Sequence, residues 1–133
     1  MPNEQYYTFT DFEPYVSTHD CFDVLGVPPD HVSRRPSDTF YRSPTECLRT
    51  HTSVYEVLQM RKGFNSFLVV GDVYRKDTID RSHYPVFHQM EGVRLLDHKS
   101  LGIKDSKEGK EICFQDLKRC LEGLSKSVFG DVE

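Results

Sequence analysis

Arg75 and the row formed by Phe87, Gln89 and Glu91 are the side chains of this 133-residue chain whose types and spacing best suit a polar ligand. In an extended strand successive side chains alternate between faces, so Phe87, Gln89 and Glu91 share one face. An ordinary half-buried strand keeps apolar residues on one face and polar residues on the other, and this strand does not sort that way. The mixed face therefore suggests a binding surface.

A second strand is predicted at residues 66–75, which end on Arg75, and antiparallel pairing would put this arginine beside the mixed face. A guanidinium can clamp a phosphate or carboxylate, a carboxylate can bind an ammonium group, and an aromatic face can stack on a flat ring. The alternative is a structural salt bridge between Arg75 and Glu91, with Gln89 at the surface and Phe87 in the core. The pattern alone leaves both interpretations open.

A second cluster of polar side chains, residues 49–53, comes directly before a predicted helix. Ser53 and Glu56 have the spacing of a capping box, which predicts a helix of two to three turns that ends at Gly63. In the simplest interpretation Ser53 caps this helix and His51 is a structural histidine. A helix N-terminus also presents free N–H groups and the positive end of a dipole, so an anion or carboxylate can bind beside His51 and Ser53.

Length and composition limit the class of protein. A chain with 37% hydrophobic and 29% charged residues suits one globular domain with one core. The net charge is -4, with five acids and no Lys or Arg in the first 25 residues, and ten bases against eight acids in residues 26–96. This mild excess does not support tight binding of nucleic acid through its phosphates, but it can receive one anionic small molecule.

The sequence lacks the signatures of several kinds of protein. There is no apolar run of about 18 residues and no signal or transit peptide, so we expect no membrane partner. The four cysteines include no C-x-x-C pair and the six histidines no H-E-x-x-H, so we expect neither a disulfide framework nor a metal held by the protein. A Ser-His-Asp order, a Walker loop and G-x-G-x-x-G are also missing, which argues against hydrolase, P-loop and Rossmann functions.

The remaining segments are predicted from composition and periodicity. Residues 1–25 indicate strand and irregular chain, and residues 26–46 hold four of the seven prolines and predict a long ordered loop or a linker. Residues 76–85 predict a long, charged and functional loop between the two strands. Residues 112–129 have apolar side chains at spacings of three and four and predict an amphipathic helix that ends at Gly130.

Three segments together resemble the catalytic core of phenylalanyl-tRNA synthetase, a class II aminoacyl-tRNA synthetase, and its organellar, single-chain type most of all. They are residues 22–41 (FDVLGVPPDHVSRRPSDTFY), 48–53 (LRTHTS) and 71–92 (GDVYRKDTIDRSHYPVFHQMEG). The resemblance covers about residues 7–133. It implies an α+β fold, a partial class II catalytic core in which an antiparallel sheet is flanked by helices.

The resemblance also implies a role for each candidate residue. Arg75, on the strand of class II motif 2, would be the catalytic residue that holds the α-phosphate of ATP and the amino-acid carboxylate. The other ATP-binding residues would be Asp77 near the adenine edge, His83 near the phosphates and Phe87 stacked on adenine. The phenylalanine-binding residues would be His51, Ser53, Gln89 and Glu91, the last two at the α-ammonium group.

The implied reaction is attack of the phenylalanine carboxylate on the α-phosphate of ATP, followed by transfer to tRNA(Phe). Mg²⁺ would be bound to ATP rather than held in a protein cage. Position 56 is Glu where the family usually has Gln, and Asp77 is shorter than the Glu of many class II enzymes. We expect motif 3, the pocket for the phenylalanine ring and an anticodon-binding domain to lie outside this chain, which would then be a partial catalytic domain with little activity of its own.

Two other functions are compatible with the same motifs. One is a non-catalytic, synthetase-derived module that binds ATP or the amino acid. The other is a related class II enzyme with a different substrate, such as a phosphoseryl-tRNA synthetase. The resemblance places the protein in a mitochondrion or another organelle, with the cytoplasm as the alternative, and it leaves the oligomeric state open.

Overall fold

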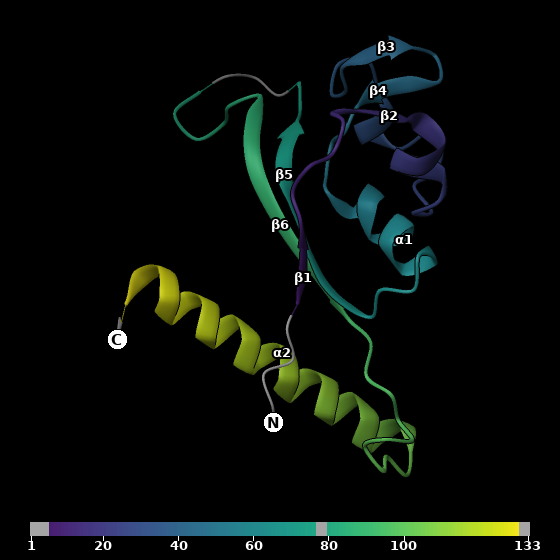
Figure 1. Ribbon diagram of the computed structural model, residues 1–133. Coiled ribbons are helices and arrows are strands. Elements are labelled where there is room, and N and C mark those ends of the chain that lie inside the picture. Colours follow the sequence, from purple (N-terminus) through teal and green to yellow (C-terminus); the bar gives the residue numbers. More distant parts are fainter. Residues whose placement is uncertain (1–5, 77–79, 131–133) are drawn as a thin grey trace. The chain divides into compact units, whose positions relative to one another are not determined.

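The computed structural model describes residues 6–76 and 80–130. They belong to two compact units, Met1–Arg94 and Leu95–Glu133. The elements, as labelled in Figure 1, are β1 (Tyr7–Phe9), β2 (Tyr15–Ser17), the π-helix η1 (His19–Asp23), the 3₁₀ helix η2 (Val32–Arg34), β3 (Tyr41–Ser43), β4 (Glu46–Leu48), α1 (Ser53–Arg61), β5 (Ser66–Tyr74), β6 (Val86–Arg94) and α2 (Ser106–Phe129).

The two longest strands, β5 and β6, form the antiparallel hairpin that the sequence predicts (Figure 1). Their register pairs Ser66 with Arg94 at one end and Tyr74 with Val86 at the other. Arg75 follows β5 directly, and its N–H donates to the carbonyl oxygen of Pro85 at 2.9 Å. The hairpin therefore brings Arg75 to the start of β6, as predicted.

The opposite edge of β5 pairs with β1, which makes a three-stranded sheet in the order β1-β5-β6. This pair is parallel, with Tyr7 beside Phe67 and Phe9 beside Val69. β5 is thus the central strand, in keeping with its nearly continuous apolar run. The sequence predicts an antiparallel sheet, and the sheet is mixed because the short alternation of β1 contains no information on its direction.

A second, smaller sheet has the antiparallel order β2-β4-β3. β3 and the first residue of β4 lie within residues 26–46, which the proline content predicts to be loop or linker. That prediction is wrong for this hairpin because Pro44 occupies the two-residue turn between β3 and β4, where no ladder hydrogen bond is lost.

The unit Met1–Arg94 contains two hydrophobic clusters where the sequence suggests one core. One cluster consists of Val54, Tyr55, Phe67 and Val69, and it joins α1 to the face of β5. The other consists of Cys21, Phe22 and Cys47, under the small sheet. Val16 packs against both clusters and links them.

Helix α1 begins and ends close to the predicted residues, but its N-terminus is built differently. The helix ends before Gly63, whose φ of +90° is a conformation that glycine adopts without strain. Its N-cap is Thr52 and has no side-chain cap hydrogen bond, while Ser53 is the first helical residue. The predicted capping box, in which Ser53 caps the helix and Glu56 completes the box, is therefore wrong.

The unit Leu95–Glu133 contains the long helix α2. The carboxylate of Asp105 accepts hydrogen bonds from the N–H groups of Lys107 and Glu108 at 2.8 and 2.9 Å, so the helix starts six residues before the predicted residue 112. It ends at Gly130, as predicted. None of the helices within residues 6–76 and 80–130 has the length and apolarity needed to cross a bilayer.

Candidate functional site

The mixed row of β6 lies on the same side of the sheet as the buried core. The register sets Phe87, Gln89 and Glu91 opposite Val73, Gly71 and Val69, respectively. Directly paired residues of an antiparallel sheet point to the same face, and both of these valines are fully buried. The prediction that the three β6 side chains share one face is thus confirmed. The β5 half of this face is buried at Val69 and Val73. The β6 half forms its margin, where Gln89 and Glu91 are half-buried and Phe87 is exposed.

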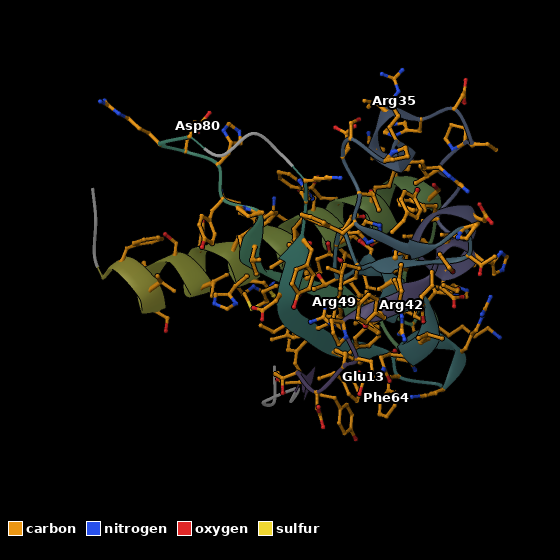
Figure 2. All side chains as sticks on the ribbon, turned by 90° about the horizontal axis from the view of Figure 1, so that it is seen from above. Glu13, Arg35, Arg42, Arg49, Phe64 and Asp80 are labelled. Carbon is orange, nitrogen blue, oxygen red and sulfur yellow. The ribbon has the colours of Figure 1, made fainter. Side chains whose placement is uncertain are left out.

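Arg49 lies across the middle of this face, close to Glu13 in Figure 2, and it explains the glycine at position 71. A Cβ on Gly71 would lie 2.9 Å from Nη2 of Arg49. Arg49 is only 4% exposed. It donates to the carbonyl oxygens of Asp72, Phe12 and Glu13 and to the phenol oxygen of Tyr55. These bonds give Arg49 a structural role between the chain segments that support the site.

Arg75, the predicted catalytic residue, lies at the end of the hairpin where the connecting loop begins. Its Nε donates to the carbonyl oxygen of Thr50 at 3.1 Å, and its guanidinium carbon is 5.1 Å from the centre of the Phe87 ring. Glu91 is opposite Val69, six residues before Arg75, which separates the two by roughly 20 Å along the strands. The alternative of a cross-strand salt bridge between Arg75 and Glu91 is therefore wrong.

His51 points into the same region from the segment before α1. Its Nε2 lies 2.9 Å from the carbonyl oxygen of Cys21 and 3.9 Å from the Cys21 sulfur. Burial opposes a charge on the ring, but the contacts with Cys21 outweigh it and raise the pKa of His51. The Nδ1 atom is buried and has no hydrogen-bond partner among the described residues. One ring nitrogen is thus fixed by the protein and the other is available for a ligand.

His51 and Arg75 line one cleft of about 370 Å³. Other lining residues are Phe22, Val27, Val32, Ser33, Asp38 and Thr39. The sequence predicts the two functional side chains but misses the others, because they come from an irregular segment with no periodicity. The only signal for that segment is its place in the resemblance, residues 22–41.

Gln89 joins β6 to the start of α1. Its Oε1 accepts a hydrogen bond from the N–H of Thr52 at 3.1 Å. The structure thereby brings Gln89 next to His51 and Ser53, the other half of the predicted amino-acid site. Ser53 is half-buried at the first turn of α1.

Glu91 and Glu56 place two carboxyl groups together at this margin. The Oε2 atom of Glu91 is buried and lacks a hydrogen-bond partner within the described part of the chain. Burial, followed by the charge of Glu91 and a hydrogen bond with it, raises the pKa of Glu56 to about 7. The charge of His51 acts in the opposite direction. The sequence does not predict this pair, because Glu56 has an adequate local role in a capping box.

His83 lies on the hairpin loop, bonded to its own neighbours. Its Nδ1 is 2.9 Å from the carboxylate of Asp80, and Figure 2 shows Asp80 on a loop that projects away from Arg49. The N–H of Ser82, then the imidazole of His83, hold the pKa of Asp80 well below its usual range. The structure thus groups His51, Gln89 and Glu91 and leaves His83 apart. Asp77 lies outside the described residues.

Known proteins are similar to this chain over most of its length. Residues 4–133 match the family tRNA synthetases class II core domain (F). The chloroplastic/mitochondrial phenylalanine--tRNA ligase of Arabidopsis thaliana is 47% identical over 94% of this chain and 29% of its own length. The mitochondrial phenylalanine--tRNA ligase of Dictyostelium discoideum is 44% identical over 92% of this chain and 31% of its own length. The mitochondrial enzyme of Saccharomyces cerevisiae is 49% identical over 73% of this chain and 23% of its own length.

Among solved structures, the pyrrolysyl-tRNA synthetase of Desulfitobacterium hafniense is 14% identical, with a TM-score of 0.49. The match covers 64% of this chain and 31% of the synthetase chain, and the similarity is too low to support a conclusion. The chain spans less than a third of the length of these three phenylalanine--tRNA ligases. The sequence relationship confirms the predicted resemblance and the predicted α+β class. The chain belongs to the family of class II tRNA synthetase core domains, type F.

Proposed function

We propose that this protein functions in the ATP-dependent activation of phenylalanine and its ligation to tRNA(Phe), and that residues 1–133 are part of the catalytic domain. The observation that carries the proposal is the placement of His51, Gln89 and Glu91 at one margin of the sheet, with buried polar atoms that lack partners among the described residues. The names of the relatives support the choice of substrates.

The phenylalanine ammonium group would bind at Glu91 and Gln89. A buried carboxylate oxygen without a partner is costly, and an ammonium donor would satisfy the Oε2 atom of Glu91. The Oε1 atom of Gln89 uses one lone pair for Thr52 and has a second one for the ligand. His51, through Nδ1, and Ser53 would complete the amino-acid site.

Arg75 would hold the α-phosphate of ATP and the amino-acid carboxylate. Its guanidinium lies over the Phe87 ring, so ATP binding would replace this cation–π contact with adenine on the ring and phosphate at the guanidinium. Asp77 and His83 would contribute from the hairpin loop. For His83 this requires a phosphate to compete with Asp80.

The reaction requires no nucleophilic side chain. The substrate carboxylate attacks the α-phosphate and pyrophosphate leaves, so the protein contributes orientation and the positive charge of Arg75. Within residues 6–76 and 80–130 no three His, Cys, Asp or Glu side chains form a metal site. We therefore propose that Mg²⁺ arrives on the phosphates of ATP, where it neutralises their charge.

We also propose that the protein works in a mitochondrion or another organelle, because the relatives from Arabidopsis thaliana and Dictyostelium discoideum are named for those compartments. A tRNA would be its macromolecular partner. Imaging of the whole protein with a fluorescent tag at its C-terminus tests the location, and a purely cytoplasmic signal would contradict it.

The test of the activity is phenylalanine-dependent exchange of labelled pyrophosphate into ATP, measured on this chain and on its reading frame extended downstream. We expect exchange in the extended protein, and a loss of about 10²–10³-fold in Arg75→Met, as for removal of one preorganised transition-state donor. The matched control is Arg42→Met, since Arg42 is exposed on β3 and pairs with Glu46 at 3.5 Å. Equal exchange in both variants would contradict the role of Arg75. Ligand binding without exchange in any form would favour the non-catalytic module.

A further inference from the structure

The buried thiol of Cys21 contacts the segment that contains His51. Cys21 belongs to the short helix η1 and is fully buried. Its Sγ atom is 3.9 Å from Nε2 of His51 and 3.6 Å from Oγ1 of Thr50. A thiol is a weak donor and a weak acceptor, so one sulfur atom can bond with both groups. These contacts join η1 to the chain directly before α1.

The backbone of Cys21 fixes the ring of His51. Carbonyl groups in the last turn of a helix have no partner within that helix, and Cys21 is in the last turn of η1, which ends at Asp23. The carbonyl oxygen of Cys21 lies 2.9 Å from Nε2 of His51 and can only accept, so Nε2 must carry a proton. The buried Nδ1 of His51, without a partner among the described residues, is then the ring atom available to a ligand.

Thr50 extends the contact from Cys21 to Arg75. Thr50 is only 4% exposed, and its carbonyl oxygen accepts a hydrogen bond from Nε of Arg75 at 3.1 Å. This bond orients the plane of the guanidinium and leaves its terminal N–H groups for an anion. Thr50, His51 and Arg75 all line the cleft of about 370 Å³. Cys21 therefore supports, from inside the protein, two of the side chains proposed to bind the substrates.

Packing is the other role that a buried cysteine can have. Cys21 forms a hydrophobic cluster with Phe22 and Cys47, and a thiol in such a cluster often acts only as a small apolar side chain. Cys47 is equally buried and belongs to β4, so it provides a cysteine of the same cluster for comparison. The contacts with His51 and Thr50 come from Cys21. Substitution of each cysteine in turn therefore separates packing from positioning.

We propose that Cys21 is a positioning residue for the activation of phenylalanine. Its carbonyl oxygen keeps a proton on Nε2 of His51, so that Nδ1 is presented to the amino-acid site, and its thiol holds His51 and Thr50 in place. Through Thr50 it also fixes the guanidinium of Arg75. Cys21 itself does not touch a substrate. This inference rests on the proposed function.

The first experiment observes the imidazole of His51 by NMR without a ligand. In the chain labelled with nitrogen-15 at the histidine rings, the wild type should show a proton on Nε2 of His51 that exchanges slowly with water. In Cys21→Ala this proton should exchange at least about tenfold faster, because the ring loses its support. Cys21→Ser retains a donor and acceptor and, like Cys47→Ala, should stay within about threefold of the wild-type rate. A wild-type His51 with a proton on Nδ1 and none on Nε2, or an unchanged rate in Cys21→Ala, would overturn the proposal.

The second experiment measures phenylalanine-dependent exchange of labelled pyrophosphate into ATP in the chain extended downstream. Cys21→Ala should lower kcat by about tenfold, because displaced His51 and Arg75 side chains align the substrate carboxylate and the α-phosphate less well. Cys21→Ser should recover most of this loss. Cys47→Ala should match the wild type, with circular dichroism as the check that each variant is folded. Equal losses of kcat in Cys21→Ala and Cys47→Ala would overturn the inference, because packing alone would then explain both.

The two experiments separate the possible failures. Wild-type kcat in the extended Cys21→Ala protein would overturn this inference and leave the proposed function intact. No pyrophosphate exchange in any extended protein, together with a slowly exchanging Nε2 proton in the wild type, would overturn the proposed function. The role of Cys21 in the reaction would fall with it, although the contact between Cys21 and His51 would stand.

Discussion

Replacement of Arg49 by Met should remove a large part of the stability of the unit Met1–Arg94. Methionine keeps much of the aliphatic stem and removes only the guanidinium. Four hydrogen bonds are then lost, to the carbonyl oxygens of Asp72, Phe12 and Glu13 and to the phenol oxygen of Tyr55, although the Glu13 carbonyl still accepts from the Tyr55 hydroxyl. At about 1 kcal/mol for each buried hydrogen bond, the expected loss is about 4 kcal/mol, against a total of roughly 5–15 kcal/mol for an ordinary domain.

The assay is urea denaturation followed by near-ultraviolet circular dichroism. Tyr55 is a suitable probe because its ring stacks on Phe12 with the ring centres 3.8 Å apart. The matched control is Arg42→Met, which removes an exposed ion pair and should cost less than about 1 kcal/mol. If Arg49→Met is too unstable to purify, Arg49→Lys retains the charge and should show an intermediate loss. Free energies of unfolding that agree within about 1 kcal/mol for Arg49→Met and Arg42→Met would contradict the structural role of Arg49.

Three further predictions concern the same surface and its loop. Gly71→Ala should lower the free energy of unfolding by about 1–3 kcal/mol, because the new methyl group meets the Arg49 guanidinium. The same substitution should lower that free energy by less when Arg49→Met is also present. Additive losses of the two substitutions in urea denaturation would contradict this. Folding raises the pKa of Glu56 from 4.5 to about 7, so the stabilisation by its protonated form is complete below 4.5 and is lost as the pH rises through 7. Glu56→Gln should therefore exceed wild type in stability at pH 8 by about 1 kcal/mol and resemble it near pH 5, and urea denaturation at the two pH values checks the difference. Carbon-13 NMR should show that Asp80 titrates below the usual aspartate range. His83→Ala should raise the pKa of Asp80 only in part, because the N–H of Ser82 still donates to its carboxylate. An unchanged pKa of Asp80 in this variant would exclude the ion pair.

The hairpin was predictable because two kinds of information agree in the sequence. The alternation of β6 fixes which side chains share a face, and the apolar run of β5 identifies the central strand that it pairs with. Together they place Arg75 at the loop end of the hairpin and Phe87 beside it, which the structure confirms.

The rest depended on contacts between residues distant in the chain. Glu56 has a sufficient local partner in the capping-box pattern, and only the folded chain shows that it turns to Glu91, 35 positions later. The buried Arg49 resembles a surface cation in the sequence, since its four acceptors come from three separate segments. The β3–β4 hairpin was hidden by prolines whose turn position cannot be distinguished from a loop by composition alone.

The margin formed by β6 and the start of α1 should bind the phenylalanyl-adenylate if the proposed function is correct. The most direct measurement is NMR of the labelled chain titrated with a non-hydrolysable phenylalanyl-adenylate analogue. We expect saturable shifts in Gln89, Glu91, His51 and Arg75. Shifts confined to the separate cleft within residues 95–133, which Leu96, Ile103 and Cys113 help to line, or no shifts at all, would contradict binding at this margin.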